Sequence, residues 1–200
     1  MSRLVLAIDT TLEIGSLALA RGDEILEEVE VRAPAGFAQI LYRELQELLA
    51  RNRVSLRDID CFAAASGPGS FTGVRVGLAC VKGLAEALGK PAAGVSNLKA
   101  LASLGTAPLR AAIIDARRGE VYAAIYDDAG RVVSPEVVTR REQWALALPA
   151  GDVEWIEQDL GAPRKLAGAI ARIAPAEMQD PAGLDANYVR RSDAELSWKE

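Results

Sequence analysis

Apolar and polar positions at the start of the chain change with the short period of β-strands. Residues 4–8 are apolar up to Asp9, residues 16–20 are small or apolar, and residues 25–32 alternate valine with charged side chains. Short apolar runs bounded by turn residues predict strands, and alternation predicts a strand with one exposed face. We therefore expect three successive strands joined by tight turns.

The next segment changes to a helical period and leads to the centre of the chain. Leucine and isoleucine recur every three or four positions over 37–53, which predicts an amphipathic helix. An apolar strand at 60–65 then enters a loop of Gly, Pro, Ser and Thr, and a long helix over 74–88 ends at Gly89. Strand, glycine loop and helix form a geometry that can hold a phosphate. The spacing of these glycines, however, fits neither the dinucleotide fingerprint nor the P-loop.

Glycines 73 and 77 lie four residues apart on one face of this helix, and Val81, Leu84 and Leu88 continue the row. Each glycine costs a helix about 1 kcal/mol relative to alanine, so such a row usually serves the close approach of another backbone. That backbone belongs either to the same chain or to a partner protein, and the sequence leaves both interpretations open.

The second half of the chain repeats the opening pattern. A strand at 111–115 ends in Asp115, a turn follows at 116–119, and strands at 120–126 and 131–133 flank a glycine turn. Asp9 and Asp115 occupy equivalent places. A duplication of this kind predicts two domains of similar topology, which we place at 1–107 and 108–200, with the end of the chain a candidate for packing back onto the first domain.

The composition excludes several kinds of catalytic and binding site. The 200 residues include no histidine, so catalytic triads, metal sites and general bases that need histidine are excluded. The net charge of -5 gives no general attraction for nucleic acid. We expect Cys61 and Cys80 to be reduced thiols in the core. Without a signal peptide or an apolar run of membrane-spanning length, we expect a cytoplasmic protein with no membrane contact.

Several polar residues are candidates for a ligand site, each with a plainer alternative. Asp9 and Asp115 could face each other and hold a divalent metal on a nucleotide phosphate, although aspartate is also common where a strand enters a turn. Adjacent arginines at 117 and 118 could grip phosphate, or be solvated, or contact a partner. Tyr188, Arg190 and Arg191 could contact RNA, on weaker grounds. The candidate nucleotide or phosphate contacts are Asp9, Thr10, Thr11, Asp115, Arg117 and Arg118.

Five stretches together resemble the bacterial TsaB (YeaZ) family. The most specific are Gly-Pro-Gly-Ser-Phe-Thr-Gly at 67–73 and Asp-Ala-Arg-Arg-Gly-Glu-Val-Tyr at 115–122; the others are residues 7–11, 79–85 and 94–96. The ordered resemblance covers roughly residues 4–126, and Tyr188-Val189-Arg190 is similar to the family's C-terminal segment. It implies an α/β fold of two tandem RNase H-like domains of the actin, sugar kinase and Hsp70 ATPase (ASKHA) class.

The same resemblance implies a function in making threonylcarbamoyladenosine next to the anticodon of tRNA. The chain would be a non-catalytic scaffold that binds and activates the catalytic subunit TsaD, with the ATPase TsaE joining them and tRNA bound only through the complex. TsaD-like proteins, once labelled glycoproteases, hold a metal with two histidines; this chain has none, so we expect no metal site and no catalytic residues here. No intrinsic cofactor is expected; ATP or ADP with Mg²⁺ at the interface with TsaD stays open.

The resemblance also implies where partners bind. Family members pair with themselves or with TsaD through the two long helices, so a homodimer is expected for the chain alone. Many relatives carry a histidine before the first helix, whereas here that stretch reads Ala-Pro-Ala-Gly-Phe at 33–37. The alternative function is a stand-alone ATPase or small-molecule kinase using Asp9 and Asp115; a peptidase is a weaker third. The expected interface residues are Phe37, Ile40, Leu41, Tyr42, Leu45, Gly73, Val74, Val76, Gly77, Val81 and Leu84.

Overall fold

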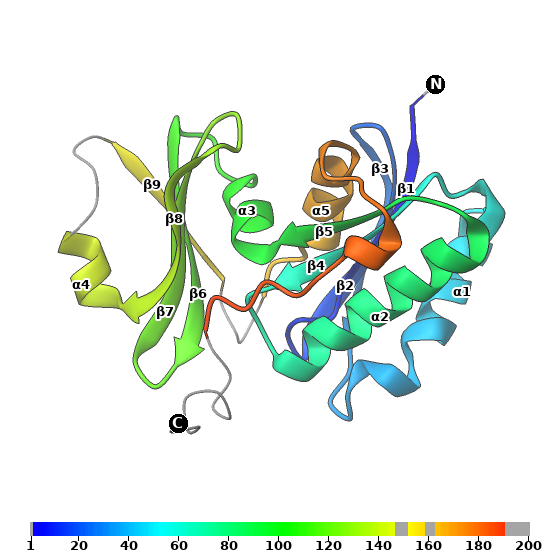
Figure 1. The fold of residues 1–200 in the computed structure, drawn as a ribbon, viewed down its shortest axis with the longest axis horizontal. Helices are drawn as coiled ribbons and strands as arrows, with labels where there is room; N and C mark the ends of the chain where they lie inside the picture. Colours follow the sequence, from blue (N-terminus) through cyan, green and yellow to red (C-terminus); the bar gives the residue numbers. More distant parts are fainter. Residues whose placement is uncertain (1, 147–151, 159–162, 191–200) are drawn as a thin grey trace.

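The computed structural model describes residues 2–146, 152–158 and 163–190, and it contains two mixed β-sheets (Figure 1). The first sheet has the strand order β3-β2-β1-β4-β5, and the second has the order β8-β7-β6-β9. In each sheet the first three strands in sequence are antiparallel neighbours and the next strand runs parallel to the first. The second sheet therefore repeats the order of β3-β2-β1-β4 and lacks a counterpart of β5 among the described residues, and an α/β fold is confirmed.

Most elements lie where the hydrophobic pattern predicts them. In the first sheet these are β1 (Leu4–Asp9), β2 (Ile14–Arg21), β3 (Glu24–Arg32), β4 (Cys61–Gly67) and β5 (Ala92–Ser96). In the second sheet they are β6 (Leu109–Arg117), β7 (Glu120–Asp127), β8 (Val132–Arg140) and β9 (Val153–Gln158). The α-helices are α1 (Leu41–Arg51), α2 (Phe71–Leu88), α3 (Asn97–Ala102), α4 (Arg141–Leu146) and α5 (Ala167–Ile173). Short 3-10 turns occupy Phe37–Gln39, Leu56–Asp58, Ala174–Ala176 and Pro181–Gly183.

Two of the predicted helices differ in detail. The helix expected over 37–53 is divided, because a 3-10 turn precedes Ile40, whose backbone (φ -116°) departs from ideal helix geometry before α1 starts. The sequence also favours a short helix over 139–148, but α4 begins only at Arg141, since β8 continues through Arg140 alongside β7. Residues 147 and 148 of that prediction lie outside the described residues.

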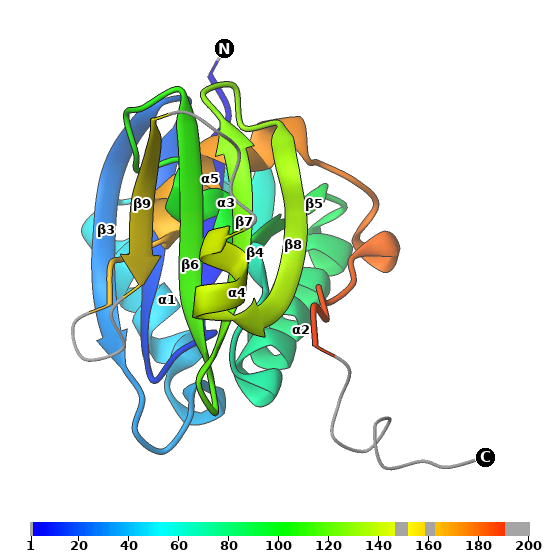
Figure 2. The same cartoon turned by 90° about the vertical axis from the view of Figure 1, so that its left-hand side faces the viewer.

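The helices lie in layers on and between the two sheets (Figures 1 and 2). Leu6 and Ile8 of β1 point to a core that they share with α1 and α2. Val5 and Ala7, on the other face of the same strand, belong to a core that includes α3, α5 and the inner face of the second sheet. Trp144 of α4 packs on the outer face of the second sheet. Alternating side chains of one fully buried strand thus serve two separate cores.

The chain returns to the first sheet after β9. Ser16 Oγ on β2 accepts hydrogen bonds from the backbone N–H groups of Leu166 (3.2 Å) and Ala167 (3.0 Å) at the start of α5. A carboxylate oxygen of Glu28 accepts another from Gly168 N (2.8 Å). These side chains cap the free N–H groups of α5. The helix that follows the second sheet in sequence is therefore held by the first, and the assigned limits of two domains stay a prediction.

Candidate functional site

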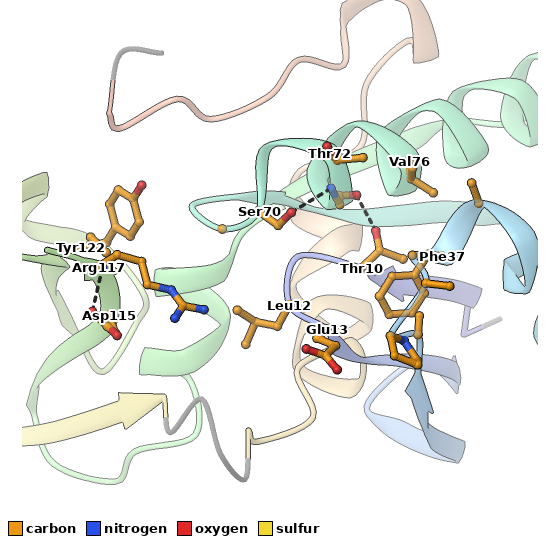
Figure 3. A pocket seen from close by; sticks show the side chains of 18 residues that line it. Thr10, Leu12, Glu13, Phe37, Ser70, Thr72, Val76, Asp115, Arg117 and Tyr122 are labelled. Atoms are coloured by element: carbon orange, nitrogen blue, oxygen red, sulfur yellow. Dashed lines mark hydrogen bonds between the residues drawn. The ribbon is translucent and has the colours of Figure 1, made fainter. Parts of the chain in front are cut away.

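A cleft of about 560 Å³ separates the two halves of the molecule at the ends of β1 and β6 (Figure 3). Its first wall comes from the loop after β1, the segment before α1 and the start of α2, and its second wall comes from the β6–β7 hairpin. Most of the surface is apolar, with Glu13 on the first wall and Arg117 on the second. The residues that line it include Thr10, Leu12, Glu13, Ala33 to Ala38, Gly69, Ser70, Thr72, Gly73, Val76, Asp115, Ala116, Arg117 and Tyr122.

Asp9 lies in the interior and does not line this cleft. Its side chain is 3% exposed, and Oδ1 accepts hydrogen bonds from Thr11 N (3.0 Å) and Thr11 Oγ1 (2.6 Å). Burial raises the pKa of the Asp9 carboxyl above its usual value, against the opposing effect of the Thr11 hydrogen bonds. Asn97 completes the network, because it donates to Thr11 Oγ1 (2.7 Å) and accepts from Gly67 N (3.0 Å). Asp9 therefore ties the end of β1 to α3 and β4.

Asp115 makes the same kind of turn at the surface. Its Oδ1 accepts a hydrogen bond from Arg117 N (2.8 Å), two residues further on, and its side chain is exposed at the cleft. Of the two aspartates that could have faced each other across a cleft, Asp115 therefore lines it and Asp9 is buried, and both make the strand-to-turn hydrogen bonds of the alternative interpretation. Within the described parts of the chain, no group of three or more His, Cys, Asp or Glu residues is placed to hold a metal ion.

The two adjacent arginines form the tip of the β6–β7 hairpin. Arg117 (φ 65°) and Arg118 (φ 57°) both adopt the left-handed backbone region that favours glycine. The Arg117 side chain extends from the second wall toward Leu12 and Glu13 on the first (Figure 3). Arg118 is exposed. Of the six candidate phosphate contacts, Thr10, Asp115 and Arg117 line the cleft, whereas Asp9, Thr11 and Arg118 do not.

The row formed by Gly73 and Gly77 packs inside its own chain. A Cβ atom built on Gly73 would lie 2.0 Å from the carbonyl oxygen of Thr10, and one on Gly77 would lie 2.6 Å from Thr10 Oγ1. Thr10 Oγ1 in turn donates a hydrogen bond to Gly73 O (2.7 Å). The backbone that approaches these two glycines is therefore the loop after β1. The hypothesis that their missing side chains serve a partner protein is wrong.

The eleven expected interface residues differ in how much of their surface is exposed. Tyr42 is 59% exposed and lies beside Cys80; the negative charge that Cys80 carries once it ionises at high pH raises the pKa of the Tyr42 hydroxyl. Ile40, Gly73, Val76 and Leu84 are partly buried. The remaining six are buried within the monomer and offer little surface to a partner: Phe37, Leu41, Leu45, Val74, Gly77 and Val81.

A different row of α2 faces outward. Positions 71, 75, 79, 83 and 87 follow one another at intervals of four, and all five are exposed. The second half of this row is small, because it consists of Ala79, Gly83 and Ala87. A Cβ built on Gly83 meets nothing within 4 Å in the part of the chain that the structure describes. Sequence reasoning missed this row because it followed the glycines whose line continues into Val81 and Leu84. Continuation into large apolar residues is the mark of a core-facing row.

An aromatic and cationic cluster occupies the other end of that row. The Arg75 guanidinium carbon lies 3.7 Å from the centroid of the Phe71 ring, and Arg75 Nε donates a hydrogen bond to the Tyr188 hydroxyl (3.0 Å). The two rings are 5.6 Å apart and tilted by 30°. Phe71 and Tyr188 are each 47% exposed. The cluster joins residues 113 positions apart in sequence, so no local pattern could have revealed it.

Both cysteines are buried and unpaired, as the sequence predicts. Burial raises the pKa of the Cys61 and Cys80 thiols to about 11, so neither is an activated nucleophile near neutral pH. No helix within residues 2–146, 152–158 and 163–190 combines the length and apolar character needed to span a membrane.

Comparison with known proteins gives consistent matches. Residues 32–162 match the model of the family described as "TsaD: tRNA N6-adenosine threonylcarbamoyltransferase". TsaB of Escherichia coli, a "tRNA threonylcarbamoyladenosine biosynthesis protein", is 37% identical over 70% of this chain and 66% of its own length. TsaB of Bacillus subtilis is 29% identical over 98% of both chains. The structure of YeaZ from Pseudomonas aeruginosa superposes with a TM-score of 0.80 at 29% identity, covering 93% of this chain and 99% of that one.

Proposed function

Because the chain belongs to the bacterial TsaB (YeaZ) family, we propose that it is a non-catalytic docking subunit in the synthesis of threonylcarbamoyladenosine in tRNA. In this proposal it binds and activates the catalytic subunit TsaD. The ATPase TsaE joins the pair, and tRNA is bound by the assembled complex. The proposal replaces the Gly73–Gly77 row with a different contact surface on the same two helices.

The docking surface consists of the outer row of α2 (Phe71, Arg75, Ala79, Gly83 and Ala87) together with Tyr42 of α1. Both helices cover the same face of the first sheet (Figure 1). Gly83 lies three residues from Cys80, beside which Tyr42 lies, so the two helices contribute neighbouring parts of one surface. Exposed tyrosine, phenylalanine and arginine are typical of interface hot spots.

Gly83 is the observation that carries the proposal. Glycine in an exposed helical position costs about 1 kcal/mol relative to alanine, and among the described residues nothing lies within 4 Å of a Cβ built on Gly83. Packing within the monomer therefore gives no reason for a glycine there. A partner backbone that passes close to α2 gives one, and the flanking alanines leave room for the same approach. The same surface would pair two copies when TsaD is absent.

A stand-alone ATPase or kinase would need free carboxylates to hold Mg²⁺ beside a phosphate. Asp9 is committed to its interior hydrogen bonds, and only Asp115 of the pair reaches the cleft. The chain also lacks histidine as a general base. The site geometry therefore supports a docking function better than an enzymatic one.

The decisive experiment adds bulk at Gly83. We expect Gly83→Leu to fold normally, because its side chain points into open space, and to lose co-purification with TsaD and tRNA modification by the reconstituted complex. Ala145→Leu adds similar bulk to exposed α4, on the far side of the molecule, and should change neither. Full complex formation by folded Gly83→Leu would contradict the proposal.

A further inference from the structure

We propose that the Phe71–Arg75–Tyr188 cluster recognises an acidic side chain of the docked subunit, which would pair with the Arg75 guanidinium between the two rings. The inference rests on the proposed function, because it places this contact at one end of the same docking surface. The inference specifies that the partner must present a negatively charged group at this place. It also makes the C-terminal segment, which supplies Tyr188, part of the surface.

Arg75 carries a charge that the described residues leave unneutralised. No ion pair joins it to a carboxylate in residues 2–146, 152–158 or 163–190, whereas Arg32, Arg43 and Arg51 each pair with a glutamate. Within the described segments, the one hydrogen bond of Arg75 runs from Nε to the Tyr188 hydroxyl. A guanidinium has five N–H donors in a planar fork, so the pair of Nη groups is left for a bidentate carboxylate.

The cluster is held in place before any partner arrives. Tyr188 follows Asn187, whose backbone N–H donates to Ser66 O (2.8 Å) and whose side-chain amide donates to Glu136 (2.6 Å). Two residues later, Arg190 pairs with Glu120 on the second sheet. The segment is thus fixed to both halves of the molecule, and its tyrosine fixes Arg75. A preorganised arginine loses little conformational entropy on binding.

The surroundings favour a protein carboxylate over RNA. Phe71 and Tyr188 are half-exposed apolar rings that would exclude water from an ion pair formed between them, as residues around a hot spot do. The row continues into Ala79, Gly83 and Ala87, whose small side chains suit a helix packed across α2. A polyanion would instead need a basic surface, whereas this chain has a net charge of -5.

The test compares charge variants of Arg75 in the full chain, with the affinity for purified TsaD measured by calorimetry. We expect Arg75→Gln to weaken binding about 10- to 100-fold and Arg75→Glu to weaken it further, because a like charge then meets the partner carboxylate. Arg75→Lys should keep part of the affinity. Tyr188→Phe removes the hydroxyl that orients the guanidinium and should cost less than Arg75→Gln. Arg131→Gln, which removes an exposed arginine on the second half, is the control and should change nothing.

Three results would overturn the inference, and they separate it from the proposed function. If Gly83→Leu blocks docking while Arg75→Glu binds normally, the docking surface stands but the acidic contact does not exist. If neither variant affects docking, the proposed function and this inference fail together. If Arg75→Gln weakens tRNA binding to the assembled complex and leaves the affinity for TsaD unchanged, the cluster binds RNA. Thermal unfolding of each variant checks that the fold is retained.

Discussion

The first strands of the two sheets end in the same turn, but in opposite surroundings. Asp9 after β1 and Asp115 after β6 each accept a hydrogen bond from the backbone N–H two residues further on, at 3.0 and 2.8 Å. Asp9 is 3% exposed, whereas Asp115 is exposed at the cleft. The shared aspartate is therefore a device for turning the chain, and its environment is decided by what packs over the turn.

The different surroundings follow from where the next helix goes. In the first half, β4 leads into α2, whose Gly73 packs directly over Thr10 in the turn. In the second half, β9 leads to α5, which packs on the first sheet and not over the β6–β7 hairpin. The second turn therefore stays open to the cleft and carries Arg117 and Arg118 in left-handed conformations. The two sheets therefore share a strand order, but the turns after their first strands lie in different environments.

The largest expected effect comes from filling the contact over the first turn. Gly73→Leu would place side-chain atoms where the Thr10 carbonyl lies, 2.0 Å from the position of Cβ. Because backbone must move, we expect a loss of about 3 kcal/mol or more of folding free energy. Gly83→Leu, on the open side of the same helix, should cost nothing measurable or stabilise the free chain. Equal losses for the two variants, in urea unfolding, would show that Gly73 is not buried against Thr10.

This pair of glycines shows how far the sequence alone could go. Periodicity placed β1, β4 and the body of α2 because apolar runs and helical spacing are local properties, and it identified the repeated strand order for the same reason. It also found that glycines on α2 serve a close approach. It could not tell whose backbone approaches, since Thr10 and Gly73 are 63 residues apart and meet only in the folded chain.

The candidate site was predictable only in part, for the same reason. Arg117 and Asp115 were found because adjacent arginines after an aspartate stand out in any sequence, and both line the cleft. Asp9 was expected beside them because its local pattern is the same; its burial depends on Asn97 and α2, which the pattern does not contain. The stacking of Tyr188 on Phe71 depends on the path of a C-terminal segment without periodicity.

Replacing each of the two aspartates by alanine should lower the free energy of unfolding by different amounts. Asp9→Ala leaves the buried N–H and hydroxyl of Thr11 without their acceptor, so we expect a loss of about 2–3 kcal/mol in the free energy of unfolding. The turn after Asp115 is already exposed, so water can replace the hydrogen bond lost in Asp115→Ala, which should cost less than about 1 kcal/mol. Chemical denaturation of both variants at one pH measures the difference. Equal costs would contradict the burial of the first turn.

The pH dependence of Asp9 gives a second, smaller test of the same burial. Its raised pKa means that the folded chain keeps the proton longer than the unfolded chain as pH rises. The carboxyl therefore contributes most to stability below its unfolded pKa, and that contribution is lost as pH rises from about 4 through the folded value. Asp9→Asn keeps an acceptor but does not titrate. We expect the stability of the parent chain relative to Asp9→Asn to fall with rising pH, and a rise would contradict the direction of the shift.

The smallest effect on stability is expected at the second turn, where Arg117 is exposed and its backbone is strained. A non-glycine residue in the left-handed region costs on the order of 1 kcal/mol, so Arg117→Gly should raise the free energy of unfolding by about 0.5–1 kcal/mol although it removes a side chain. The equivalent position of the first turn, Thr11, carries buried hydrogen bonds, and Thr11→Gly should destabilise instead. Opposite signs at matched positions would establish that one repeat uses its turn to hold the fold, whereas the other keeps a strained arginine at the cleft. A loss of stability in Arg117→Gly would mean that this arginine supports the hairpin and that the two turns are more alike than their burial suggests.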